Sequence, residues 1–186
     1  MKKYISIIIL FGLFIIGCSD DSVVNSSPTQ LQNDYKLVKL PAHSGLQINN
    51  NYSDSKQITG STGGTLSLQR SYSGGPYGTV TVNSTLEFMG GSFSGTKTIT
   101  MTADDEYCAS SFSPGMSFSL PGIYNITYTG VDLSEINPST AKFVYLKANG
   151  ELEYPMHDGI IVDQSIGKIQ VINARLDHFS RYGFVN

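Results

Sequence analysis

The sequence predicts an all-β protein built on a single antiparallel β-sandwich, and three observations lead to that prediction. Beyond Tyr35, apolar and polar residues alternate with a period of two in one short run after another, as half-buried strands require. Glycine and proline pairs separate these runs, and such pairs mark tight turns. The one stretch with helical character, residues 132–139, contains Pro138, which limits it to a turn. Short strands at regular spacing are typical of sandwiches.

The first element of the chain is a secretory signal peptide over residues 1–17. Two lysines precede an apolar run that ends at Ile16, and this run is shorter than the roughly 20 residues that a membrane-spanning helix needs. The run leads into "IIGC", which ends at Cys18 and resembles a bacterial lipobox. The resemblance implies that Cys18 is acylated, for example with palmitate, and becomes the new N-terminus. The alternative is an ordinary cleaved signal with an incidental cysteine.

The second element is a flexible tether over residues 18–34. The stretch "SDDSVVNSSPTQLQND" contains no aromatic and no basic residue, so it cannot bury enough apolar surface to offset the entropy lost on ordering. Asp20 and Asp21 directly follow the cysteine. They resemble the acidic export signal that carries lipoproteins of Bacteroidota-type bacteria to the outer leaflet, and the alternative is a plain polar spacer.

The folded part follows, with residues 35–56 expected as a linker or first strand and residues 57–186 as the sandwich. In "GTVTVNSTLEF" the apolar residues Val80, Val82 and Leu86 share one parity, so they face the core in a half-buried strand. The stretch "KFVYLKANGELEYP" predicts a hairpin at its Asn-Gly pair. The same alternation recurs at Leu66 and Leu68, Ile99 and Met101, Met116 with Phe118 and Leu120, Tyr124 with Ile126 and Tyr128, and Ile169 and Val171.

Four stretches taken in order resemble a known domain family. They are "GGTLSL" (63–68), "LEFMGGSFSGTKTITM" (86–101), "FSPGMSFSLPGIYNITYTGVDL" (112–133) and the terminal "HFSRY" (178–182). Together they resemble the ZU-five β-sandwich of ankyrins and netrin receptors, and related domains of bacterial surface lipoproteins. One departure is "MGGS" (89–92), where relatives usually carry a proline-rich turn. The resemblance implies a sandwich used for protein contact or structural spacing, although fold alone does not fix function.

Charge and cysteine content narrow the classes of partner. Removal of the signal peptide takes away Lys2 and Lys3, so ten of the twelve basic residues remain against all fifteen acidic residues. No basic run remains that could neutralise phosphates, and we therefore expect no nucleic-acid partner. With Cys18 committed to lipid, Cys108 has no partner for an intramolecular disulfide. We expect Cys108 to be a small core residue on a strand.

The sequence offers little for catalysis, so we expect no enzyme, no metal and no cofactor. The stretch "GSFSG" has phenylalanine where a nucleophile elbow needs serine. The cluster Asp104-Asp105-Glu106 cannot by itself supply the converging oxygens that Ca²⁺ requires, and we expect a solvated turn there. The three histidines, His43, His157 and His178, are far apart in sequence, and the His157-Asp158 pair has no third member.

One triplet, His178-Phe179-Ser180, leaves two interpretations open. In a few self-cleaving proteins a serine preceded by His-Phe cuts the chain at its own amide bond, which would make His178 and Ser180 catalytic and place the cut between Phe179 and Ser180. If residues 176–185 instead form one last strand, His178, Ser180 and Tyr182 share a face and tie that strand to a neighbouring loop. Cleavage requires a kink or bulge, because a regular strand keeps its amides planar.

These observations together lead to one functional expectation. We expect a monomeric lipoprotein, anchored by Cys18 in the bacterial outer membrane, whose sandwich is a structural or protein-binding module at the cell envelope. Its membrane contact is the lipid anchor and its further partner is an unidentified protein or envelope component. If Asp20 and Asp21 act as an export signal, the domain lies on the cell surface. The alternative is a self-cleaving domain that cuts between Phe179 and Ser180.

Overall fold

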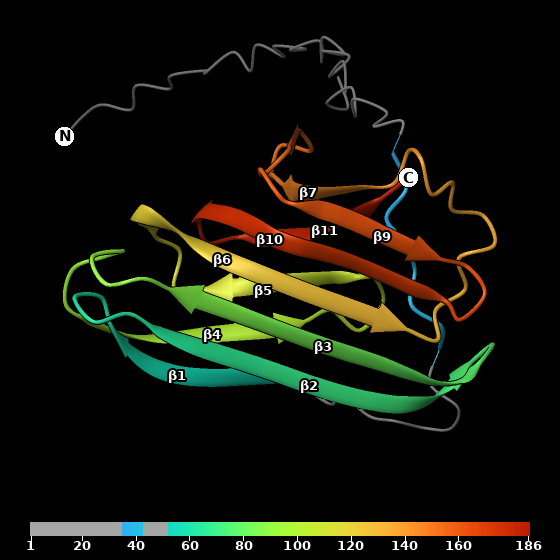
Figure 1. Cartoon of the computed structure of the whole chain (residues 1–186), viewed down its shortest axis with the longest axis horizontal. Helices are drawn as coiled ribbons and strands as arrows, with labels where there is room; N and C mark the ends of the chain where they lie inside the picture. Colours follow the sequence, from blue (N-terminus) through green and yellow to red (C-terminus); the bar gives the residue numbers. More distant parts are fainter. Residues whose placement is uncertain (1–34, 43–51) are drawn as a thin grey trace, which may run out of the picture. The chain divides into compact units, whose positions relative to one another are not determined.

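The computed structural model describes residues 35–42 and 52–186, and the expected signal peptide, Cys18 and the tether lie outside these residues. The described residues form eleven strands in two antiparallel sheets that pack face to face (Figure 1). The predicted antiparallel β-sandwich is confirmed. The strands are β1 (Ser53–Thr59), β2 (Gly64–Gly75), β3 (Gly78–Phe88), β4 (Thr96–Ala103), β5 (Ala109–Ser113), β6 (Ser117–Thr129), β7 (Lys142–Leu146), β8 (Leu152–Glu153), β9 (Gly159–Asp163), β10 (Lys168–His178) and β11 (Arg181–Val185).

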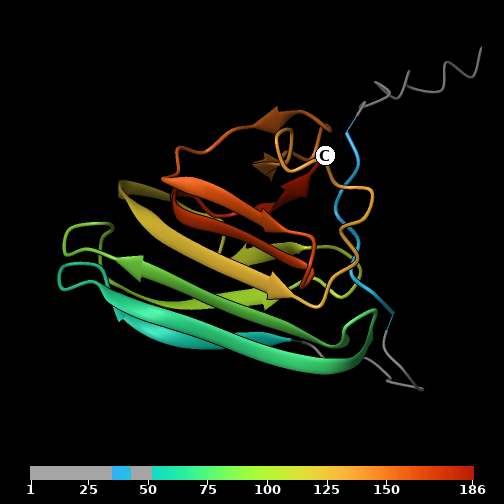
Figure 2. The ribbon, with the colours of Figure 1, turned by 45° about the vertical axis from the view of Figure 1, so that its right-hand side comes forward.

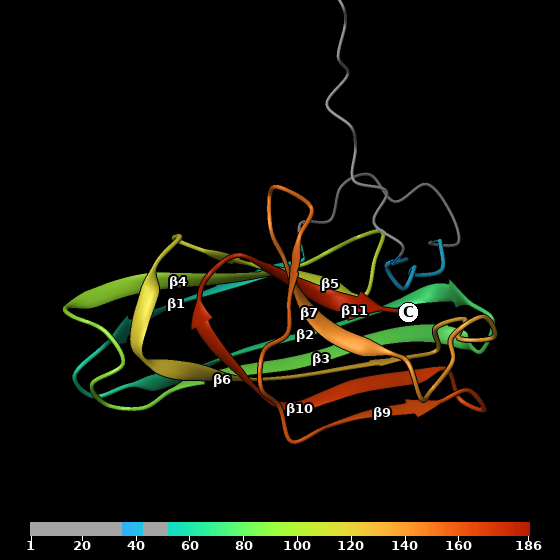
Figure 3. The same cartoon turned by 90° about the horizontal axis from the view of Figure 1, so that it is seen from above.

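The two sheets have different numbers of strands, and the chain passes from one sheet to the other several times. The six-stranded sheet has the order β1-β4-β5-β11-β7-β8, and the five-stranded sheet has the order β2-β3-β6-β10-β9. Figure 3 shows the two layers from above, with β9 and β10 in the layer opposite to β7 and β11. Strands β1 and β8 are therefore the edges of the first sheet, and β2 and β9 are the edges of the second.

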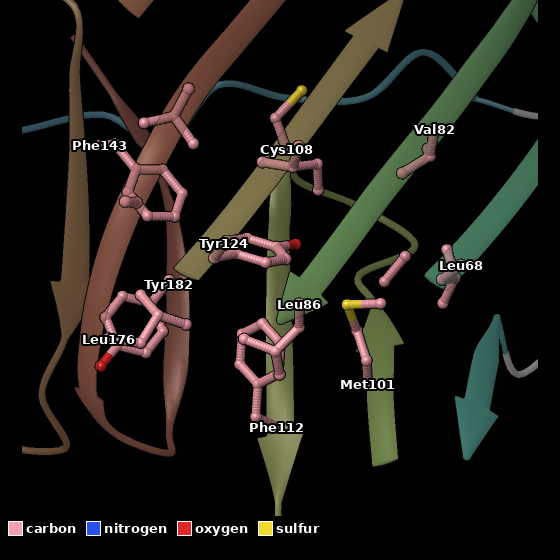
Figure 4. Packing of buried hydrophobic residues seen from close by; sticks show 14 of the residues in the cluster. Leu68, Val82, Leu86, Met101, Cys108, Phe112, Tyr124, Phe143, Leu176 and Tyr182 are labelled. Atoms are coloured by element: carbon pink, nitrogen blue, oxygen red, sulfur yellow. The ribbon is translucent and has the colours of Figure 1, made fainter. Parts of the chain in front are cut away.

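The core lies between the two layers and follows the alternation in the sequence. On β3, Val80, Val82 and Leu86 are buried and their polar neighbours face outward, as predicted. Figure 4 shows apolar side chains from both sheets meeting around Tyr124. Its hydroxyl donates to Ser110 Oγ at 2.9 Å, and this bond explains how a tyrosine can be fully buried.

The folded part begins before the expected boundary at residue 57. That boundary falls inside β1, and residues 35–40 already form an extended segment that runs past the C-terminal strand (Figure 2). The Val38 amide donates to Phe184 O at 2.9 Å, and the Val38 carbonyl accepts from the Cys108 amide at 2.8 Å. The Val38 side chain is 1% exposed, so this segment, expected as linker or first strand, contributes directly to the core.

Two predicted turns are present with the expected sequence chemistry. Strands β7 and β8 pair as an antiparallel hairpin around the Asn149-Gly150 dipeptide, which confirms the predicted hairpin. Only Gly150 takes a positive φ, of 84°, so the turn differs from the two-residue type that needs positive φ at both positions. Residues 132–139 form turns and no helix, as Pro138 requires.

Candidate functional site

The His178-Phe179-Ser180 triplet lies where the chain crosses from one sheet to the other. The prediction of one continuous strand over residues 176–185 is wrong, because β10 ends at His178 in the five-stranded sheet and β11 begins at Arg181 in the six-stranded sheet. Two backbone hydrogen bonds fix this crossover. Phe179 N donates to Met116 O at 2.8 Å, and Ser180 O accepts from Phe112 N at 2.9 Å.

Phe179 explains why the chain turns inward at this point. Its side chain is 6% exposed and its ring lies 4.8 Å from the Phe118 ring, 5.3 Å from the Phe112 ring and 5.9 Å from the Phe88 ring, measured between centroids. A continuous strand would place this ring on the face opposite to Leu176, away from the core. The free energy gained by burying the Phe179 ring therefore offsets the free energy lost where the strand pairing is interrupted.

His178 and Tyr182 lie on the two sides of the crossover and contact each other. The Tyr182 hydroxyl donates to the His178 carbonyl oxygen at 2.7 Å and lies 3.3 Å from His178 Nδ1. The His178 ring also packs edge-on against Tyr145, with centroids 4.5 Å apart, and its Nε2 lies 3.9 Å from Glu153 Oε1. Burial and the nearby Glu153 carboxylate raise the pKa of Tyr182, so its hydroxyl stays protonated and acts as a donor.

Ser180 is placed apart from this pair. Its side chain is half-buried, and within the described residues its hydroxyl makes no hydrogen bond to His178 or to any other group. The strand pairing is interrupted at the bond between Phe179 and Ser180, and neither residue has a positive φ. The contacts of His178 are to Tyr182, Tyr145 and Glu153. Self-cleavage by His178 and Ser180 stays a prediction.

Cys108 and the acidic cluster at 104–106, which the sequence singled out, contribute to packing and to a turn. Cys108 is fully buried, and burial raises the pKa of its thiol well above the ordinary value. Asp104 closes the turn before Cys108 by accepting the amides of Glu106 and Tyr107 at 2.9 Å each, and it pairs with Arg181 Nη2 at 2.6 Å. The acidic cluster therefore includes a carboxylate that holds a turn and the start of β11.

The described residues contain no group of three or more His, Cys, Asp or Glu side chains that could hold a metal ion. His43 lies outside the described residues, and His157 is exposed in the loop between β8 and β9. The neighbouring Asp158 accepts the Asn173 side-chain amide at 2.7 Å. The expected solvated His157-Asp158 pair is thus partly engaged with β10.

A groove of about 830 Å³ lies between residues 35–41 and the turns at 132–136. Its lining carries both signs of charge, with Lys36 and Lys39 on one side and Asp132 and Glu135 on the other. Asn186 joins the two sides, since its side-chain amide donates to Glu135 O at 3.1 Å. The mixed charge and the exposed position do not select one class of ligand.

The two sides of the sandwich differ in how their edges are protected. On the side of β1 and β2, Lys56 Nζ donates to the Thr65 carbonyl at 2.9 Å, and Arg70 Nη2 donates to the Ser53 carbonyl at 3.1 Å and pairs with Asp54. These side chains use edge carbonyl groups that another strand would need. The other side consists of the two-residue strand β8, the connection 154–158 and the edge strand β9.

This second side, the β8–β9 side (residues 152–163), carries exposed apolar side chains. Tyr154 is 58% exposed, Met156 70% and Ile161 41%. Ile161 faces outward next to Gln170, while Ile160 and Val162 pack against the core. The sequence reasoning missed this surface. Its signal was the run Ile160-Ile161-Val162, in which the alternation of apolar and polar residues fails.

Comparisons of the chain with protein-family models, with curated proteins and with solved structures found no match. The likeness to ZU-five domains therefore stays a prediction from the quoted motifs. Across the described ranges, no helix has the length and apolar character needed to cross a membrane.

Proposed function

We propose that this protein is a lipid-anchored lipoprotein of the bacterial outer membrane whose β-sandwich acts as a protein-binding or structural module at the cell envelope. The observation that carries the proposal is the N-terminal pattern of two lysines, an apolar run and "IIGC" ending at Cys18. Two or three acyl chains on that cysteine anchor a protein firmly, at roughly 0.8 kcal/mol per buried CH₂ group.

The arrangement of the chain after Cys18 supports a module held close to the membrane. A polar tether of the length of residues 18–34 has an r.m.s. reach of roughly 20–25 Å. Within the described segment 35–42, Val38 is held between Phe184 and Cys108 by backbone hydrogen bonds. Any pull on the tether is thus transmitted to two parts of the same sheet, which suits a domain that is held at one end and binds with another surface.

The test is acylation at Cys18. Cells that express the full-length chain and take up radiolabelled palmitate should label the protein, and the Cys18→Ser variant should carry no label. The matched control is Cys108→Ser, which removes the other thiol and should keep the label. Label that persists on the Cys18→Ser protein would contradict the anchor.

Self-cleavage between Phe179 and Ser180 is the second candidate, and the break in strand pairing at this bond favours it. In that reaction Ser180 Oγ attacks the Phe179 carbonyl carbon and the carbon–nitrogen bond breaks. This leaves an ester and a free amine on Ser180, and water then hydrolyses the ester. The Ser180→Ala variant would remain uncut while the parent chain loses "SRYGFVN" after denaturation.

A further inference from the structure

Strand β9 has the features of an edge that another strand can join. It pairs with β10 on one side and is the last strand of its sheet on the other (Figure 3). An edge strand leaves alternate N–H and C=O groups available to an added strand, and proteins usually block such edges with charges, prolines or bulges. Strand β9 contains no proline, and its one charged residue is Asp163 at the last position.

The opposite side of the same sandwich shows that this fold can protect its edges. Lys56 and Arg70 bond carbonyl groups of residues in β1 and β2. Among the described residues, no lysine or arginine side chain bonds a backbone group of β9 in this way. In the described part of the molecule, basic side chains therefore protect the edges at β1 and β2 but not the edge at β9.

Apolar side chains accompany the open edge. The residues Tyr154, Met156 and Ile161 are three of the seven large hydrophobic residues that are exposed in the described chain, and all three lie within eight consecutive positions. Ile161 projects from the outer face of β9, where alternation would place a polar residue. Lys142 Nζ lies 5.2 Å from the centroid of the Tyr154 ring, whereas the Met156 carbonyl accepts from Arg175 N in line with the pairing of β9 and β10. A strand laid along β9 and continued past Gly159 would therefore contact Ile161 and Met156 and would gain apolar contact beyond its backbone bonds.

Charge selects the kind of strand that fits. The stretch 153–166 contains Glu153, Asp158 and Asp163 and no lysine or arginine. Lys147 already faces Glu153 at 3.6 Å. The carboxylates at the two ends of β9 accept side-chain bonds from the neutral donors Asn173 and Ser165. Lys168 lies opposite Asp163 in the pairing with β10, but among the described residues the two side chains form no ion pair within 4.0 Å. Basic residues on an added strand would therefore meet opposite charge at both ends of β9.

The same charges disfavour a second copy of this chain as the occupant. Antiparallel self-pairing that opposes Ile161 to Ile161 would place Asp158 opposite Gln164 of the other copy, next to its Asp163. This brings acidic side chains together at both ends of the pairing. The charges therefore favour a segment of a different protein over a second copy.

We propose that β9 is a docking edge for an extended segment of a partner protein that carries apolar side chains at alternate positions and basic residues at its ends. This inference rests on the proposed function as a binding module, because it names the surface and the chemistry of the partner. It is independent of acylation at Cys18. If the protein carries no palmitate but still binds a strand at β9, the lipid anchor is contradicted and the docking edge is not.

The experiment uses the full-length protein purified from membranes in detergent and three synthetic peptides. The first is a nine-residue peptide of alternating valine and threonine with lysine at each end, the second has glutamate at the ends, and the third is the lysine peptide methylated on every backbone nitrogen. Binding is measured by fluorescence anisotropy, and amide hydrogen exchange locates the bound peptide. We expect the lysine peptide alone to bind and to slow exchange of the β9 amides.

Variants decide whether the edge carries this binding. Ile161→Lys and Met156→Lys should each weaken binding of the lysine peptide by about tenfold or more, since an apolar contact is lost and a positive charge is added. Met89→Lys is the matched control, because Met89 is 58% exposed in the turn after β3 and should leave binding unchanged.

Several results would overturn the inference. They are equal binding of the glutamate peptide, binding that survives backbone methylation, and loss of affinity in Met89→Lys equal to that in Ile161→Lys. Slow exchange of the β9 amides before any peptide is added would show that the chain itself already covers this edge. Self-association that Ile161→Lys abolishes would assign the edge to a second copy.

Discussion

Replacement of Phe179 by alanine should destabilise the sandwich more than any change to the polar residues beside it. The Phe179 ring is 6% exposed and contacts the rings of Phe88, Phe112 and Phe118. Its removal leaves a cavity at the crossover, and large-to-small changes of this kind cost about 3–5 kcal/mol. For a domain of this size that corresponds to a fall in Tm of roughly 6–20 °C.

The two polar positions of the crossover provide the comparison. Tyr182→Phe removes the 2.7 Å bond to the His178 carbonyl and should cost about 1 kcal/mol. Ser180→Ala should change the free energy of unfolding by less than about 0.5 kcal/mol, because the serine hydroxyl has no partner among the described residues. The free energy of unfolding of all three variants is measured by urea titration, with circular dichroism as the signal. A Ser180→Ala variant that loses as much stability as Phe179→Ala would refute the account of the crossover.

Three further predictions follow from the sequence and the fold. If Asp20 and Asp21 are an export signal, their replacement by alanine should keep acylation but protect the domain from protease added to whole cells; unchanged shaving would reduce them to spacer. Val38→Ala should lower the free energy of unfolding by about 1.5–3 kcal/mol in urea titrations, and no loss would show that the first segment is not part of the core. Burial raises the pKa of Tyr124 and Tyr128, so these side chains favour the fold below pH ~10 and this contribution is lost as the pH rises further; ionisation of either side chain before unfolding, separated from that of the exposed tyrosines by comparison with Tyr124→Phe and Tyr128→Phe, would contradict it.

Much of the fold could be predicted from the sequence because alternation reports directly on which side chains a strand buries. Val80, Val82 and Leu86 face the core as expected. Phe179, an apolar residue on the face opposite to Leu176, indicates a kink in the sequence, but alternation could not show that the chain crosses to the other sheet there. The burial of the Phe179 ring decided the path of the chain here, against the alternation of residues 176–185. The segment 35–40 was also hard to place, since its pairing partners lie far away in the sequence, at residues 106–108 and 184–186.

For the candidate sites too, local motifs could be recognised in the sequence, whereas features that depend on the arrangement of the strands could not. The resemblance to a lipobox at Cys18 rests on a local motif, so the sequence alone is enough to propose it. The open edge depends on which strands end up at the margins of the two sheets, and this is a property of the topology. The turn at Gly90 is a further case. A side chain there would meet the Ser61 carbonyl oxygen at 2.8 Å, so glycine at this position allows two turns to pack closely.

The intact mass of the protein, extracted from membranes in detergent and denatured before analysis, tests the central proposal most directly. We predict one species whose mass equals residues 18–186 with two or three acyl chains on Cys18. Denaturation is needed because a cut β11 could stay paired in its sheet. An unacylated chain released from the membrane would contradict the lipid-anchored module, and a fragment that ends at Phe179 would replace it with a self-processing domain.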